Sequence, residues 1–459
     1  MSDSMLTSYQ AAHALAAQTK GADVAFSRVN TDSRALAPGD LFVALKGERF
    51  DGHQFAVQAL QQGAAAVMIN ASATANIEGP AIVVADTRIA LGQLAAYWRG
   101  RFSIPLVAVT GSNGKTTVKE MLAAILRASS DSDEVLATQG NLNNDIGMPL
   151  TLLSLRAHHR YAVIEMGMNH LGEISYLTRL ASPDVALINN AHAAHLEGLK
   201  SVAEVARAKG EIFEGLKANG IAVINADDAY AASWRKLAQP HRIVDFGLLH
   251  EAAVSATYKL GAAASDIHLH TPEGDCEVKL QVAGMHNVKN ALAATAAAVA
   301  LGVANALIAR GLAEFGGVKG RLQRKSCLHG ALLIDDTYNA NPDSVRAAIA
   351  VLALSPGKKI LVLGDMGELG AEAIALHTQI GLQAKQAGVD NLLALGSLSQ
   401  HAAEGFGTGA MFFERIQELL AEIENRLAPG VTMLVKGSRF MQMERVVKSF
   451  ELGVVKDEK

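Results

Sequence analysis

The segment LVAVTGSNGKTT, residues 106–117, joins a short apolar strand to a glycine-rich turn and then to a helical pattern. Glycines allow backbone N–H groups to curl around phosphate oxygens, and the N-terminus of the following helix adds the positive end of its dipole. We therefore predict a phosphate-binding loop here. Its members are Gly111, Ser112, Asn113, Gly114, Lys115, Thr116 and Thr117.

Two residues of this loop have predicted chemical roles. Lys115 would reach the β- and γ-phosphates of ATP, and the Thr116 hydroxyl would ligate Mg²⁺. The loop departs from the G-x-x-x-x-G-K-[ST] pattern, because Val109 stands where that pattern has its first glycine. An ordinary turn with a chance lysine is the alternative. The flanking strand and helix favour phosphate binding, since they stand where that function needs them.

Composition narrows the class of protein. The chain has 459 residues, half of them apolar, with 41 basic and 45 acidic side chains. The length predicts about three domains, and the charge balance indicates no nucleic-acid partner. Two cysteines without metal spacing indicate a reduced, cytoplasmic protein. The most apolar run, residues 291–309, is rich in alanine, so it predicts one or two buried helices and not a membrane span.

Alternation of strand and helix patterns predicts an α/β protein of three domains. Residues 1–85 would form a small α/β domain, whose polar turn residues are either solvated or a site for an anionic ligand. Residues 86–318 would form the central ATP-binding phosphate-loop domain, with a mostly parallel sheet. Residues 319–459 would form a Rossmann-like, doubly wound domain. The glycine-rich segment 316–320 is the predicted linker and hinge.

Polar residues at predicted strand ends are candidates for a ligand site, because parallel sheets bind ligands there. Glu165 ends one strand and is a candidate Mg²⁺ ligand; His195 follows another and is either a ligand or a satisfied polar group. Lys209 lies on a predicted helix over 202–216 and, on pattern alone, is a surface lysine. The remaining candidates, which are either loop residues or ligand contacts, are Ser33, Arg34, Asn141, Asn143 and Asn144.

Several motifs, taken in order, resemble those of the Mur ligases, the ATP-dependent amide-forming enzymes of peptidoglycan precursor synthesis. They are TGSNGKTT, IEMG, HLE, AKGEIF, HNVKN and the GR pair at Arg321. The segments DDTYNANPDS, GNLNNDIG, GDMGELG and KGSR are similar to the branch that joins D-alanyl-D-alanine to UDP-N-acetylmuramoyl-tripeptide. The N-terminal pattern TDSR, PGDLF, DGH resembles a UDP-binding domain shared with a neighbouring branch.

The resemblance implies a role for each matching residue. Lys115 would bind the phosphates, Thr116 and Glu165 would ligate Mg²⁺, and His195 would lie near a second Mg²⁺. Lys209 matches a lysine that several relatives carry as a carbamate. The family's aspartate before the histidine is replaced by Ala194. The residues that would contact adenine, phosphate and ribose are Asn287, Asn290, Arg321 and Asp336. The residues that would bind the UDP-muramoyl end are Ser33, Arg34, Asn141, Asn143 and Asn144.

The implied reaction activates a carboxylate as an acyl phosphate, which the acceptor amine then attacks. The alternatives are another Mur-type ligase that adds a single amino acid, a folylpolyglutamate synthase, a simple ATPase or kinase, and a non-catalytic nucleotide-binding protein. About a hundred residues precede the phosphate loop, unlike in folylpolyglutamate synthases, and a D-N-P-R acceptor motif is missing. A monomer is expected.

Overall fold

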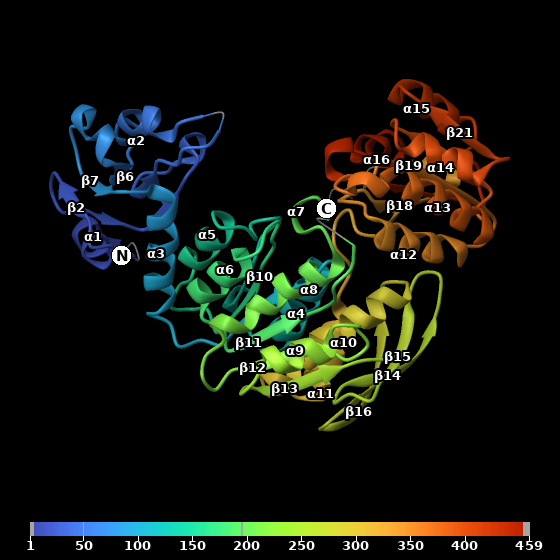
Figure 1. Ribbon diagram of the computed structural model, residues 1–459, viewed down its shortest axis with the longest axis horizontal. Helices are drawn as coiled ribbons and strands as arrows, with labels where there is room; N and C mark the ends of the chain where they lie inside the picture. The colour runs from blue at the N-terminus through green and yellow to red at the C-terminus, as the bar shows by residue number, and fades with distance from the viewer. Residues whose placement is uncertain (1–3, 49, 194–195, 453–459) are drawn as a thin grey trace, which may run out of the picture.

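The computed structural model describes residues 4–48, 50–193 and 196–452. Figure 1 shows three α/β bodies that follow one another along the chain: an N-terminal body in blue, a central body in green and yellow, and a C-terminal body in orange and red. The N-terminal and C-terminal bodies lie at opposite ends of the central one (Figure 1). The prediction of an α/β protein is confirmed; the predicted borders at residues 85 and 318 remain predictions.

The N-terminal sheet has the strand order β2-β7-β6-β5-β4. The strands β1 and β3 form a separate antiparallel pair. The helix α3 (Thr87–Arg99) follows this sheet and packs against α5 (Gly147–Leu153) and α6 (Glu173–Ala181) of the central body. The bounds are β1 (Leu6–Thr7), α1 (Ser8–Ala14), β2 (Gln18–Lys20), β3 (Ala25–Phe26), β4 (Arg28–Asn30), β5 (Asp40–Val43), α2 (Ala56–Gln61), β6 (Ala66–Asn70) and β7 (Ala81–Val84).

The central sheet has the order β13-β12-β11-β8-β10-β9, and every neighbouring pair is parallel. All five residues of β8 are buried, as expected for an inner strand covered on both faces. The bounds are β8 (Leu106–Thr110), β9 (Val135–Ala137), β10 (Tyr161–Glu165), β11 (Val185–Ile188), β12 (Ile221–Asn225) and β13 (Arg242–Phe246).

Alternate residues of β8 point into two different cores. Val107 and Val109 pack with α4, α10 and α11, whereas Leu106 and Ala108 pack with the core that includes α3, α5 and α6. The strands β14, β15 and β16 form a separate antiparallel sheet. The bounds are α4 (Lys115–Ser129), α5 (Gly147–Leu153), α6 (Glu173–Ala181), α7 (Leu196–Leu199), α8 (Val202–Gly210), α9 (Ala231–Leu237), β14 (Ser255–Leu260), β15 (Ser265–Thr271), β16 (Gly274–Leu280), α10 (Met285–Ala300) and α11 (Asn305–Glu314).

The C-terminal sheet has the order β17-β18-β22-β19-β20-β21, and only β17 is antiparallel within the described strands. Helices cover both faces of this sheet, as in a doubly wound fold. The bounds are β17 (Gln323–Ser326), β18 (Leu332–Asp336), α12 (Pro342–Ala353), β19 (Lys358–Gly364), α13 (Ala373–Gln386), β20 (Asn391–Leu395), α14 (Ser399–Phe406), β21 (Ala410–Phe413), α15 (Ile416–Glu424), β22 (Val431–Lys436) and α16 (Glu444–Phe450).

The helix predicted over 202–216 is shorter than expected. α8 ends at Gly210, and a 3-10 segment over Glu211–Gly215 follows, whose Ile212 carbonyl accepts a hydrogen bond from the Thr178 hydroxyl at 2.7 Å. The surface interpretation of Lys209 was wrong, because its side chain is almost fully buried. Within the described residues, no helix combines the length and the apolar character needed to cross a membrane.

Candidate active site

A cleft of about 1450 Å³ lies where the central and C-terminal bodies face each other. The phosphate loop and the carboxyl end of β10 line its central side, and the strand ends of the C-terminal sheet line the other. Because the strands of each sheet are mostly parallel, their polar carboxyl ends meet at this edge. The cleft therefore joins candidate residues that the sequence analysis found in separate motifs.

Gly114 permits the tight turn of the phosphate loop. Its φ of +78° lies in the left-handed region, and a Cβ atom there would stand 2.3 Å from Oδ1 of Asn290 and 2.7 Å from Nδ2 of Asn189. α4 begins at the next residue, Lys115, so its free N–H groups point into the cleft. The predicted loop-to-helix geometry is present.

Two asparagines at the end of β11 brace the phosphate loop from the neighbouring strand. Nδ2 of Asn189 donates to the backbone carbonyl of Asn113 at 2.9 Å and to Oδ1 of Asn290 at 3.1 Å. The backbone N–H of Asn113 donates to Oδ1 of Asn190 at 2.9 Å. The sequence analysis gave these two residues no role; their position directly after a buried strand beside β8 was the available signal.

Lys115 folds back onto its own loop. Its Nζ donates to the carbonyl of Gly111 at 2.6 Å and to that of Ser112 at 3.3 Å. Burial lowers the pKa of Lys115, the charge of Glu165 opposes that shift, and the charge of Arg321 adds to it. The amine is therefore held at the position where phosphate oxygens would approach the loop.

Lys209 is buried and is not among the residues that line the cleft. The pKa of Lys209 is well below its ordinary value. Burial is the main cause, and the charge of Lys115 is the second. A neutral amine is the form that reacts with CO₂, so the environment suits the implied carbamate. Its presence stays a prediction.

Glu165 ends β10 with its side chain in the cleft, and the residue is buried. Oε1 accepts a hydrogen bond from Nδ2 of Asn143 at 2.8 Å, whereas Oε2 is buried and has no partner among the described residues. An unpartnered buried carboxylate oxygen is costly unless it binds a cation. Oxygen donors of this kind are those that Mg²⁺ prefers, so Glu165 fits the predicted Mg²⁺ ligand.

Replacing Glu165 by glutamine is expected to raise the Mg²⁺ concentration needed for half-maximal turnover by at least about tenfold and to lower the maximal rate. The amide keeps the shape and removes the charge. A Mg²⁺ titration of ATP-dependent phosphate release measures both changes. Glu173→Gln, which alters another cleft glutamate, is the control. A titration curve unchanged by Glu165→Gln would place Glu165 outside the metal site.

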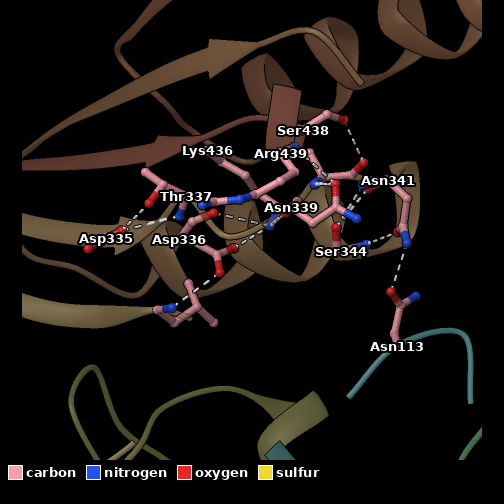
Figure 2. A network of polar contacts seen from close by, with 12 residues as sticks. Asn113, Asp335, Asp336, Thr337, Asn339, Asn341, Ser344, Lys436, Ser438 and Arg439 are labelled. Carbon is pink, nitrogen blue, oxygen red and sulfur yellow. Dashed lines mark hydrogen bonds and ion pairs between the residues drawn. The ribbon is translucent and has the colours of Figure 1, made fainter. Parts of the chain in front are cut away.

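The C-terminal wall of the cleft carries a buried ion pair (Figure 2). Asp336 and Lys436 are opposite each other at the ends of the parallel strands β18 and β22, and Nζ of Lys436 lies 2.6 Å from Oδ2 of Asp336. Lys436 also donates to the carbonyl of Asn339 at 2.8 Å. Burial raises the pKa of Asp336, and the charge and hydrogen bond of Lys436 oppose that shift. The sequence analysis noted Lys436 only as part of the KGSR turn.

Removing one member of this pair should destabilise the C-terminal body. Lys436→Met is expected to lower its free energy of unfolding by about 3–5 kcal/mol, because the Asp336 carboxylate is left buried and unpaired. The double variant Lys436→Met, Asp336→Asn should lose less than the sum of the two single losses. Urea unfolding measures each value. If the losses of unfolding free energy in the two single variants add up exactly to the loss in the double variant, the side chains of Asp336 and Lys436 are not energetically coupled.

Two hydrogen bonds connect the C-terminal body to the phosphate loop. Nη2 of Arg321 donates to Oγ1 of Thr116 at 2.9 Å, and the guanidinium lies over the ring of Tyr338 at 4.2 Å. Nδ2 of Asn341 donates to Oδ1 of Asn113 at 2.8 Å, as Figure 2 shows. Arg321 directly follows the predicted hinge at 316–320, so movement there would break or form both contacts.

The other predicted residues divide between the cleft and the outside. Asn141, Asn143 and Asn144 all line the cleft, although Oδ1 of Asn144 also accepts hydrogen bonds from the N–H groups of Ile146 and Gly147. Asn287, Asn290 and Asp336 line it as well. Ser33 and Arg34 do not; the Arg34 side chain is exposed and paired with Asp32. His195 lies outside the described residues.

The central sheet carries a phosphate loop, and a second, doubly wound sheet faces it across the cleft. This arrangement is typical of an ATP-binding α/β enzyme. Family models match most of the chain: "Mur ligase family, catalytic domain" over residues 25–99, "Mur ligase middle domain" over 109–298, and "Mur ligase, glutamate ligase domain" over 320–439. The chain belongs to the Mur ligase family, and it is an ATP-dependent ligase that forms a peptide bond.

Individual relatives are similar over nearly their full length. The UDP-N-acetylmuramoyl-tripeptide--D-alanyl-D-alanine ligase of Escherichia coli K12 is 45% identical, with 95% of this chain and 96% of that protein covered. The crystal structure of MurF from Acinetobacter baumannii has a TM-score of 0.91 at 40% identity, covering 96% and 98%. MurF from Thermotoga maritima in complex with ADP has a TM-score of 0.81 at 29% identity, covering 92% and 96%.

Proposed function

We propose that this enzyme joins D-alanyl-D-alanine to UDP-N-acetylmuramoyl-tripeptide in the cytoplasmic synthesis of peptidoglycan precursors, as a monomer. The observation that carries the proposal is the 45% identity, over nearly both full lengths, with a relative that bears this name. The motifs GNLNNDIG and DDTYNANPDS, singled out by their resemblance to that branch, both contribute residues to the cleft.

ATP would bind along the phosphate loop. Lys115 would move its amine from the loop carbonyls of Gly111 and Ser112 to the β- and γ-phosphates, and the N-terminus of α4 would add its dipole. Thr116 and Glu165 would hold Mg²⁺, with His195 and a carbamylated Lys209 near a second ion. Bound Mg²⁺ would neutralise charge on the transferred phosphoryl group.

The substrate carboxylate would attack the γ-phosphate, and an acyl phosphate and ADP would form. The amine of D-alanyl-D-alanine would then attack the activated carbonyl carbon, and phosphate would leave. Water must be kept out, because it would hydrolyse the acyl phosphate. The contacts Arg321–Thr116 and Asn341–Asn113 join the two walls and would hold the cleft closed during these steps.

The remaining predicted contacts complete the proposed site. Asn287, Asn290, Arg321 and Asp336 would surround the nucleotide. Asn141, Asn143 and Asn144 would lie along the muramoyl-peptide end. Ser33 and Arg34 would bind the UDP end from the N-terminal body, outside the central cleft.

Phosphate release from ATP tests the proposal directly. We expect turnover only when UDP-N-acetylmuramoyl-tripeptide and D-alanyl-D-alanine are both present. In mass spectrometry the product should be heavier than UDP-N-acetylmuramoyl-tripeptide by one dipeptide residue. Turnover with a single amino acid in place of the dipeptide would instead support the Mur-type alternative. ATP hydrolysis that needs neither substrate would indicate a simple ATPase and overturn the proposal.

A further inference from the structure

Four side chains of types that can ligate metal ions share one face of the β15–β16 hairpin. His268 and His270 are two residues apart on β15, so they share a face of the sheet. In the register of the hairpin, His268 is opposite Glu277 and His270 is opposite Asp275. None of the four lines the cleft.

The carboxylate of Asp275 forms a hydrogen bond with each of the two imidazoles. Nδ1 of His270 lies 3.0 Å from its Oδ1, and Nε2 of His268 lies 3.2 Å from its Oδ2. The candidate ligand atoms of these three residues all lie within 4.8 Å of one another.

These distances suit a small tetrahedral cation. With metal–ligand bonds of about 2.0–2.2 Å, neighbouring ligand atoms of a tetrahedral site lie about 3.3–3.6 Å apart. Both His–Asp pairs are near that spacing, and the ligand nitrogens of the two imidazoles, which lie within 4.8 Å of each other, must move closer together to reach it. The ring centroids of His268 and His270 are 4.9 Å apart.

We propose that His268, His270 and Asp275 form a surface site for one divalent cation of the zinc class, with a fourth position open to water. Two imidazoles and one carboxylate are donors that favour Zn²⁺ over Mg²⁺, which prefers oxygen ligands only. Glu277 would act as an orienting partner, because its Oε1 lies 3.8 Å from Nδ1 of His268, the nitrogen that faces away from Asp275. The cation would tie the two strands together.

Calorimetric titration of the full-length enzyme with zinc chloride, in the presence of saturating Mg²⁺ and ADP, tests the site. The wild-type protein should bind one more equivalent of Zn²⁺ than the variant His268→Gln, His270→Gln. Asp275→Asn should weaken binding at this site at least tenfold. His401→Gln is the matched control, because His401 is a partly exposed histidine with one carboxylate partner, Glu404, at 2.9 Å.

Zinc should also raise the melting temperature of the wild-type protein and of the control, but not that of the double histidine variant. Melting without zinc shows whether each variant is folded; if the double variant is not, Asp275→Asn decides the result. Equal zinc stoichiometry and affinity in wild type and variants would overturn the proposal, and the four residues would then be an ordinary cross-strand cluster of ion pairs. An equally tight response to Mg²⁺ would also overturn it.

Discussion

Lys115→Ala should lower the rate of ATP-dependent phosphate release by about 10³-fold or more, with little change in stability. The amine stands at the mouth of the phosphate loop, where its charge would serve mainly the transferred phosphoryl group. In the structure its partners are two loop carbonyls, which water can satisfy after truncation. The loss should appear in kcat more than in the KM for ATP, because the interaction strengthens in the transition state.

Steady-state phosphate release and a thermal melt measure both expectations. Lys236→Ala, which truncates an exposed lysine of α9, is the control and should retain full activity. Turnover of Lys115→Ala within tenfold of wild type would contradict the assignment. A large drop in melting temperature would mean that Lys115 supports the loop fold and would leave kcat uninterpretable, in which case Lys115→Met, which keeps the aliphatic stem, decides.

Lys209→Ala should be nearly inactive, and short-chain carboxylic acids should partly restore its turnover. The side chain is buried close enough to Lys115 for its charge to lower the pKa of Lys209, so a second ammonium ion there would be repelled. A carbamate would reverse that charge and offer oxygen ligands. Acetate or formate could occupy the space left by the truncation and supply the missing anion.

The pH dependence follows from the same shift. A lysine whose pKa is lowered by the fold is neutral at a pH where an ordinary lysine is charged, so the carbamate should form at a lower pH than on an ordinary lysine. It should be lost as the pH falls further and the amine takes up a proton. Turnover of the alanine variant across acetate concentrations measures the rescue. Loss of activity without rescue would indicate a plain functional amine; normal activity in the variant would exclude any role for Lys209.

Local patterns of the chain determined most of the secondary structure. The apolar β-branched run before Gly111, the glycine turn and the amphipathic helix after it each follow from short-range preferences, so β8, the loop and α4 could be predicted together. The same reasoning located Glu165 at a strand end and the alanine-rich helices. It failed at α8, where helical periodicity continues past Gly210 although the backbone tightens to contact Thr178 of α6.

The site itself depends on contacts that no local pattern carries. Asn341 and Asn113 are 228 residues apart in the chain and share a hydrogen bond, and Arg321 reaches Thr116 across 205 residues. Motif order and resemblance assigned roles to Lys115, Thr116 and Glu165, because those motifs bear their chemistry in short runs. They could not show that Asn189 and Asn190 brace the loop or that Lys436 pairs with Asp336, because strand order and register determine both contacts.

The clearest contrast is Lys209. In the sequence it stands among small residues on a predicted helix, and on that pattern alone it is a surface lysine. Only the packed fold buries that helix face and places the amine near Lys115, and burial in a medium of low polarity is what lowers its pKa. The sequence determined which elements form and which chemical groups they carry; the tertiary structure decided which of those groups meet and what charge they can hold, because desolvation and neighbouring charge arise only when distant segments pack together.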